Sequence, residues 1–289
     1  MIPKSFTPKL FLICFLTIGS LSAADKIKVL IADGPQKAHK FRDTTPALKK
    51  VLEQQPIFEV DHSRSSKESC EDGSYMPNFS DYDVIVINEG FAAADWPKAT
   101  QKAFEDYMAN GGGMVSVHAA NNCWPKWEEY NKMTGIGGWA GRNEKSGPYL
   151  YIDSRGEVVR DNSKGKGGAH GPQHEFEVVV RDAHHPIMQG LPRTFKHGPD
   201  ELYDKLRGPA ENVTILASAY SAKEYRGTER HEPVLMVIDY GKGRVFHTIL
   251  GHHVKQIMEG SFVTTFQRGT EWAATGKVTI PVPRGFPDQ

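Results

Sequence analysis

Four short apolar runs in the first half of the chain predict the strands of a parallel sheet. They occupy residues 27–32, 58–60, 84–87 and 114–117. Their hydrophobic residues are continuous and do not alternate with polar ones. That pattern is typical of strands that helices cover on both faces.

Amphipathic segments between these runs predict helices. One helix is expected to open at Thr45-Pro46, and a second is expected after Pro97 and to end at the glycines of residues 111–113. Both carry apolar residues at the i, i+3, i+4 spacing of one buried face. This alternation predicts an α/β fold with three layers, flavodoxin-like, around a mostly parallel central sheet.

The second half of the chain is less regular. Residues 135–171 are rich in glycine and charged residues and predict long loops, interrupted by a short strand at 149–152. Further strands are expected at 174–180 and 213–217, followed by a C-terminal hairpin formed by 234–238 and 244–249 and a closing helix from about Gly260. We interpret residues 24–289 as a single domain of this fold.

The first 23 residues have the pattern of a cleaved signal peptide. Lys4 and Lys9 precede an apolar run at 10–18, and Leu21-Ser22-Ala23 offers a small-residue cleavage site. A retained anchor is the alternative, although the run is short for a bilayer span. Cleavage after Ala23 predicts a periplasmic or secreted protein, and no other segment is long and apolar enough to predict a membrane helix.

Charge and cysteine content narrow the classes of partner. The chain has 35 basic and 35 acidic residues, and loss of the signal would leave a net charge of −2. This balance gives no electrostatic reason to expect nucleic acid or a membrane surface as partner, and no nucleotide cofactor is expected. Cys70 and Cys123 would remain after export, either as a disulfide or as two buried free thiols; the sequence leaves both open.

Polar residues at the predicted strand ends mark a candidate site. Asp33, Glu89 and His118 each follow a strand, and ligands of open α/β sheets bind outside the carboxyl ends of the strands. His118 is the strongest candidate, because the strand, tight turn and small residues around it resemble a nucleophile elbow with imidazole at the exposed position. An imidazole there suits a general base or a metal ligand. Loop polarity alone is the alternative for each residue.

Three more polar groups lie later in the chain. His170 and His174 have a spacing that suits a metal on a helix, but Gly171 and Pro172 argue against a helix, so they would reach a site only from a loop. His197 precedes Asp200 and Glu201, which are expected to form the first turn of a short helix and either stabilise its dipole or orient an imidazole. Finally, His252 follows a predicted strand and Gly251, which permits close approach of the backbone.

Taken in order, these segments resemble the ThuA-like (trehalose utilisation) domain family. The resemblance covers about residues 27–278 and is carried by the order and spacing of several motifs: Gly-Gly-Gly-Met-Val-Ser-Val-His118-Ala-Ala, His185-Pro186-Ile187 with Gly190-Leu191-Pro192, Asp200-Glu201-Leu202-Tyr203, Tyr240-Gly-Lys-Gly-Arg244-Val-Phe, and Leu250-Gly251-His252.

This resemblance implies a fold similar to the class I glutamine amidotransferases and a small-molecule carbohydrate substrate, such as a sugar or a keto-sugar. Amidotransferases of that fold carry a cysteine at the elbow, where this chain has His118, and Cys123 lies five residues further on. Cysteine-dependent amidotransferase chemistry is therefore not expected. Trp139, flanked by glycines, is the best candidate for stacking on a sugar ring.

The working hypothesis is a carbohydrate-processing enzyme with hydrolase, lyase or isomerase chemistry. His118 and His252 would be an acid/base pair or the ligands of a divalent metal, with Glu201 or Asp200 as partner. Zinc suits such a site better than magnesium. Asp33, Glu89, Trp139, His170, His174 and His197 are the candidate substrate-binding residues. A non-catalytic carbohydrate-binding or scaffold domain and a metal-free hydrolase are the alternatives; the oligomeric state is left open.

Overall fold

The four predicted apolar runs form the parallel half of a large sheet. In the computed structural model, which describes residues 26–287, the strands of this half lie in the order β2-β1-β3-β4-β13. They are β1 (Ile27–Asp33), β2 (Phe58–Arg64), β3 (Val84–Asn88), β4 (Gly113–Val117) and β13 (Gly243–Thr248). Every residue of β3 and β4 is buried, which explains their unbroken hydrophobic runs. The order matches that of flavodoxin-like sheets.

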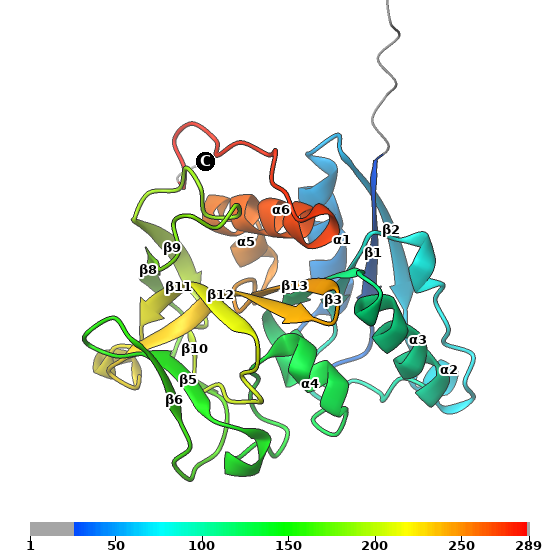
Figure 1. The fold of residues 1–289 in the computed structure, drawn as a ribbon, viewed down its shortest axis with the longest axis horizontal. Helices are drawn as coiled ribbons and strands as arrows, with labels where there is room; N and C mark the ends of the chain where they lie inside the picture. Colours follow the sequence, from blue (N-terminus) through cyan, green and yellow to red (C-terminus); the bar gives the residue numbers. More distant parts are fainter. Residues whose placement is uncertain (1–25, 288–289) are drawn as a thin grey trace, which may run out of the picture.

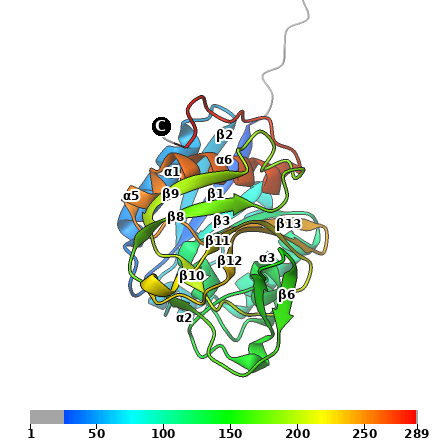
Figure 2. The same cartoon turned by 90° about the vertical axis from the view of Figure 1, so that its left-hand side faces the viewer.

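An antiparallel half continues the same sheet on the other side of β13. The strands follow in the order β12 (His231–Tyr240), β11 (Val213–Tyr220), β8 (His174–Val180) and β9 (Thr194–Asp200), with β5 (Tyr149–Ile152) pairing to β12 and to β6 (Val158–Asp161). The predicted hairpin is β12–β13, and it joins the two halves. Figure 2 looks onto β8 and β9, at the outer edge of the antiparallel half.

Helices cover both faces of the sheet and complete three layers (Figure 1). On one face lie α1 (Phe41–Glu53), α5 (Val254–Ile257) and α6 (Gly260–Thr275), and on the other α3 (Lys98–Ala109) and α4 (Glu128–Thr134). The remaining elements are short: α2 (Lys67–Glu71), the 3-10 turns η1 (Phe79–Asp81), η2 (His118–Asn122), η3 (Glu144–Ser146) and η4 (Lys223–Tyr225), and a two-stranded sheet of β7 (Ala169–His170) and β10 (Tyr203–Asp204).

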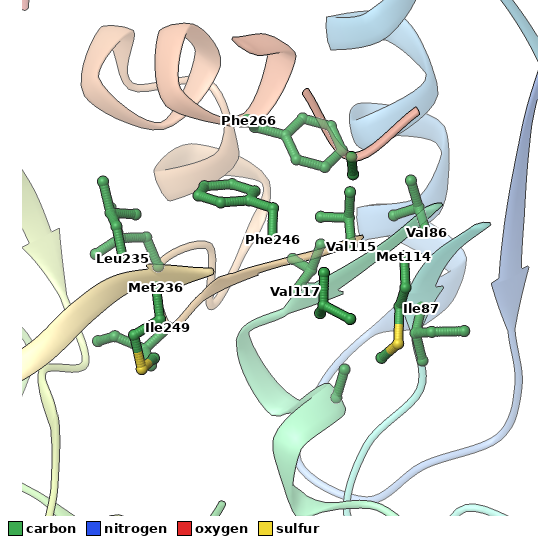
Figure 3. Packing of buried hydrophobic residues seen from close by; sticks show 14 of the residues in the cluster. Val86, Ile87, Met114, Val115, Val117, Leu235, Met236, Phe246, Ile249 and Phe266 are labelled. Carbon is green, nitrogen blue, oxygen red and sulfur yellow. The ribbon is translucent and has the colours of Figure 1, made fainter. Parts of the chain in front are cut away.

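The core between the sheet and α6 is built from cross-strand neighbours. Val86, Val115 and Phe246 are register partners on three adjacent strands, and all are fully buried. Figure 3 shows them on the side of the sheet that Phe266 of α6 covers, whereas Met114 points to the other face. The alternation of side chains along each strand thus fills both layers from one apolar run.

Two predicted helix starts are wrong. The first helix begins at Phe41, five residues before Pro46, and the buried Phe41 side chain lies in this earlier turn. The segment that contains His197 and Asp200 is the strand β9 and not a helical turn. Pro199 is tolerated there because β9 is an edge strand, where a missing backbone N–H breaks no inner ladder.

The direction of the strands decides which segments meet. Four antiparallel pairings separate β13 from β9, so β9 runs the same way as the parallel strands. The carboxyl ends of β1, β3, β4, β9 and β13 therefore lie at one edge of the sheet. Within residues 26–287, no helix has the length and apolar content needed to cross a bilayer, and the predicted signal peptide lies outside the described residues.

Candidate active site

His118 occupies a sharp turn at the end of β4. Its φ of 46° lies in the left-handed region, which is costly for a residue with a side chain, and η2 begins at the same residue. Strand, strained residue and helical turn reproduce the geometry of an elbow. The sharp turn predicted at His118 is therefore present, and the small residues Ala119 and Ala120 that follow it are buried.

Four side chains from separate segments converge at this turn. The Nδ1 atom of His252 lies 3.1 Å from Nε2 of His118, 3.1 Å from Nε2 of His39 and 3.1 Å from Oε2 of Glu201. Oε2 of Glu201 is also 3.8 Å from Nε2 of His118. Within residues 26–287 this is the one group of three or more such side chains suited to hold a metal ion, with its ligand atoms all within 4.8 Å of one another.

Burial favours the neutral form of two imidazoles of this cluster, His118 and His39. Burial, reinforced by His39 and His252, holds the pKa of His118 well below its ordinary value. Burial and the neighbouring His252 lower the pKa of His39 to about 4. Burial alone would raise the pKa of Glu201, but the hydrogen bond from His252 and the surrounding histidines lower it overall. Neutral imidazoles with free lone pairs and an ionised carboxylate are the forms that bind metals.

The orientation of His118 also fits a metal ligand. Its Nδ1 donates a hydrogen bond to the carbonyl oxygen of Ile249 at 2.6 Å, which fixes the tautomer and leaves the Nε2 lone pair facing the cluster. Ligands around one tetrahedral zinc ion stand about 3.3–3.4 Å apart, close to the 3.1 Å separations between the histidine nitrogens here. The donor set of three imidazoles and one carboxylate is one that zinc accepts.

A small cavity opens onto the cluster. It has a volume of about 170 Å³ and combines aromatic and polar walls. Its lining residues are Ala38, His39, Phe91, Asn122, Trp139, His170, Glu201, Tyr203 and His252. Tyr203 links the wall to the cluster, because its hydroxyl oxygen lies 2.7 Å from Nε2 of His118 and the Trp139 ring meets the Tyr203 ring edge-on at 4.7 Å between centroids.

The comparison with known families agrees with this geometry. The family model of ThuA, described as "Trehalose utilisation", matches residues 28–273, which is most of the chain. The chain belongs to the ThuA family. This confirms the resemblance inferred from the motifs and places the protein in a family implicated in carbohydrate metabolism.

Solved structures of ThuA-like proteins share the fold. A ThuA-like protein from Parabacteroides merdae is 42% identical, with a TM-score of 0.86 over 91% of this chain and 95% of that one. A ThuA-like protein from Bacteroides uniformis is 21% identical, with a TM-score of 0.60 over 89% of this chain and 95% of that one, a likeness of fold alone. None of the curated proteins matches the sequence significantly. The predicted fold class is confirmed.

Several predicted site residues meet as expected in this ThuA-family chain. His118, His252 and Glu201 share the cluster, and Trp139 and His170 line the cavity beside it. His170 pairs with Tyr203 in the small β7–β10 sheet, so it reaches the site from a short strand where a loop was predicted. Their roles toward a ligand stay predictions.

Other predicted residues lie elsewhere. Asp33 is buried in contacts with Arg64, His62 and Thr45, and it is not among the residues that line the cavity. Its charge is thereby neutralised inside the fold. His174 stacks on Tyr225 with 3.7 Å between ring centroids and is not a member of the cluster. Neither Asp33 nor His174 lines the cavity, so the structure gives no support to the substrate contacts predicted for them.

Glu89, His197 and Asp200 are also not among the residues that line the cavity. Glu89 is buried, with Oε1 accepting hydrogen bonds from Ser65 at 2.8 Å and Trp96 at 3.5 Å. His197 and Asp200 are fully buried behind the cluster, where they bond to each other. None of the three is among the cavity-lining residues, so direct substrate contact or catalysis by them is not supported.

Of the two alternatives for Cys70 and Cys123, the structure shows free thiols and not a disulfide. Cys70 and Cys123 are both free and buried. The Sγ atom of Cys123 contacts the carbonyl oxygen of Gly90 at 3.4 Å, and burial raises the pKa of its thiol well above the ordinary value. Burial likewise raises the pKa of Cys70 to about 11. The alternative of two buried thiols is the correct one, and neither thiol is poised as a nucleophile.

Sequence reasoning missed several residues of the site, and three of them are polar: His39, Asn122 and Tyr203. His39 lies six residues beyond the end of β1, too far into a loop for the strand-end rule to single it out. Asn122 and Tyr203 line the cavity, although the sequence pattern gives Asn122 no role and names Tyr203 only within a family motif. The signal that could have found His39 was the high histidine count, twelve in the chain, combined with its place after a parallel strand.

Proposed function

We propose that this ThuA-family chain is a carbohydrate-processing enzyme that acts on a sugar or keto-glycoside at the His118 cluster. The observation that carries the proposal is the convergence of His39, His118, His252 and Glu201 beside a cavity with aromatic and polar walls. Family membership supports a carbohydrate as substrate. Perturbed pKa values in a concave site are typical of functional residues.

In this proposal a divalent metal, preferably zinc, is held by His39, His118, His252 and Glu201. When bound, such an ion supplies polarisation of a carbonyl or hydroxyl oxygen of the sugar. The chain itself supplies orientation: Ile249 holds the tautomer of His118, and the buried Tyr203 hydroxyl is a donor directed into the cluster. Without an ion, the same imidazoles could only exchange protons with each other and with substrate.

The cavity walls suit a small polyol. Trp139 and Phe91 offer apolar ring surface, while Asn122, His170 and Glu201 offer hydrogen-bonding groups. Pockets for drug-sized ligands have volumes of roughly 300–1,000 Å³, whereas this one has about 170 Å³. We therefore expect one sugar ring inside the cavity, with any second ring outside it.

Metal content and turnover test the proposal together. Purified protein should contain stoichiometric metal by elemental mass spectrometry and should convert at least one member of a panel of disaccharides and their keto derivatives. His118→Ala should lose both properties, because it removes the ligand at the strained turn. His174→Ala is the matched control, since His174 stacks on Tyr225 outside the cluster, and it should keep both.

The other outcomes identify the alternatives. Turnover by metal-free wild type that survives chelation would favour a hydrolase using water activated by His118. Sugar affinity without turnover of any substrate, retained in His118→Ala, would favour a carbohydrate-binding module.

Export is a separate part of the proposal. It rests on the basic, apolar and small-residue pattern of residues 1–23. Intact-mass measurement of protein recovered from the producing cell should show a chain that begins at Ala24. A full-length chain in the cytoplasm would contradict export without affecting the proposed chemistry.

A further inference from the structure

We infer that Asp200 is a positioning residue that holds two of the proposed metal ligands, Glu201 and His252, in their places. The inference deepens the proposed function and rests on it for the role of the metal. Asp200 itself is fully buried at the end of β9 and does not line the cavity. Its effect on the site would pass entirely through the backbone.

The carboxylate of Asp200 accepts hydrogen bonds from the backbone of both ligand segments. Its Oδ1 accepts from the N–H of Glu201 at 2.8 Å and from the N–H of His252 at 3.4 Å. Its Oδ2 accepts from the N–H of Gly251 at 2.8 Å. One side chain thus ties the segment after β9 to the segment after β13, and each segment carries one ligand of the cluster.

The backbone at Gly251 shows why such a tie is needed. Its φ is 104°, a conformation that residues with side chains rarely adopt, and a Cβ there would lie 2.7 Å from the ring of Phe262. The turn therefore presents the N–H groups of Gly251 and His252 inward, where burial would leave them unsatisfied without an acceptor. A carboxylate can accept several such bonds at once, and bonds to a charged acceptor are the strong ones.

Two further polar contacts orient the Asp200 carboxylate, through His197 and Ser261. The Nε2 of His197 lies 3.0 Å from Oδ2 of Asp200, and its Nδ1 lies 2.7 Å from the Oγ of Ser261. His197 belongs to β9 and Ser261 to the first turn of α6. An imidazole in these two contacts links the carboxylate to the hydroxyl, so the carboxylate is oriented by both a strand and a helix.

Asp33 provides a matched comparison within the same chain. It is also a fully buried aspartate at the end of a strand. Its oxygens contact Arg64, His62 and Thr45, and none of these belongs to the cluster. Loss of the Asp33 carboxylate should therefore cost stability without moving a proposed ligand.

The experiment compares Asp200→Asn with Asp33→Asn. Asparagine keeps one oxygen but turns an N–H donor toward groups that are themselves donors. For Asp200→Asn we expect zinc affinity, measured by competition with a chromogenic chelator, to fall about 10- to 100-fold, as for other residues that orient metal ligands. Amide hydrogen exchange of the metal-free protein should become faster at Glu201, Gly251 and His252. Asp33→Asn should leave the affinity and these three amides unchanged.

The two readouts separate the inference from the proposed function. If wild type binds no zinc, the metal proposal fails, and the exchange rates of the three amides still judge whether Asp200 holds the segments. If Asp200→Asn lowers stability but leaves zinc affinity and the three amides as in wild type, the inference is overturned. Should Asp200→Asn not fold, Ser261→Ala takes its place, because it removes only the contact behind His197. Faster exchange at the three amides is then expected, and unchanged exchange overturns the inference.

Discussion

At the scale of single residues, Glu89 is a carboxyl group whose ionised form is destabilised by burial. It is 1% exposed, and Oε2 has no hydrogen-bond partner among the described residues. Burial raises its pKa from 4.5 to about 7, against the opposing hydrogen bonds from Ser65 and Trp96, and the nearby Asp33 adds to the rise. The folded state therefore favours the protonated, neutral form of Glu89 over the ionised form.

The pH dependence of stability should reveal this group. A raised pKa means that the folded state holds the proton more tightly than the unfolded state, so its stabilising effect is complete below about 4.5 and is lost as the pH rises toward 7. The shift of the Glu89 pKa from 4.5 to about 7 corresponds to a loss of about 3 kcal/mol in the free energy of unfolding. Glu89→Gln cannot ionise and should not show this loss.

Urea unfolding of wild type and Glu89→Gln at pH 4.5 and pH 7.5 measures the effect. Relative to the variant, wild type should lose free energy of unfolding between the two pH values. Because other carboxyl groups and histidines titrate equally in both proteins, the difference isolates Glu89. If the free energies of unfolding of wild type and Glu89→Gln differ by the same amount at both pH values, Glu89 ionises as freely in the folded protein as in the unfolded chain.

At the scale of elements, α6 depends on one glycine for its close approach to the sheet. Gly269 lies in the middle of the helix, and a Cβ there would meet the Phe246 ring of β13 at 2.1 Å. Phe246 is fully buried, so the ring has no free space to enter. Contacts from α6 to β4 and β13 form the interior of this layer (Figure 3).

Gly269→Ala has two opposite effects on stability: it raises the helix propensity of α6 and adds a carbon atom to a filled core. Alanine favours a helix by about 1 kcal/mol over glycine, whereas an added carbon in a filled core costs about 1–3 kcal/mol. At 2.1 Å the overlap lies at the severe end, so we expect net destabilisation of about 1–2 kcal/mol in urea unfolding. Phe246→Leu combined with Gly269→Ala should show favourable coupling, because the smaller side chain vacates the space. Stabilisation by Gly269→Ala alone would mean that α6 packs more loosely than the structure describes.

At the scale of the whole molecule, the candidate site joins distant parts of the chain. His39 follows β1, His118 follows β4, Glu201 follows β9 and His252 follows β13. These strands belong to both halves of the sheet. A metal site formed by all four side chains exists only in the folded state, so binding of an ion there would add directly to the free energy of unfolding.

Zinc should therefore stabilise the metal-free protein against unfolding. At a free concentration 100 times the dissociation constant, the expected gain is about 2.7 kcal/mol. Thermal or urea unfolding after treatment with a chelator, with and without added zinc, gives this number. His252→Ala should lose most of the gain, and His174→Ala should keep it. An equal gain in His252→Ala would place the binding elsewhere on the molecule.

Much of the parallel half could be predicted from the chain alone. The runs at 27–32, 84–87 and 114–117 are strands as expected, and His118 stands at the predicted turn. The antiparallel half is predicted only in part, since the pattern at Pro199-Asp200-Glu201 predicts a helical turn where the structure has the end of β9. Its alternation is broken by Gly198-Pro199, and only pairing with β8 makes it a strand.

The sequence by itself determined the layering and the position of the elbow, because continuous apolar runs must be covered on both faces and a strand end needs a turn. The tertiary structure decided which polar side chains meet. Asp33 and Glu89 end neighbouring strands but are held by Arg64 and Ser65, while His39 reaches the cluster from a loop and Asp200 supports it from behind. The direction of a polar side chain at a strand end depends on the hydrogen-bond and charge partners that other segments bring to it. Those partners are set by the packing of the whole chain.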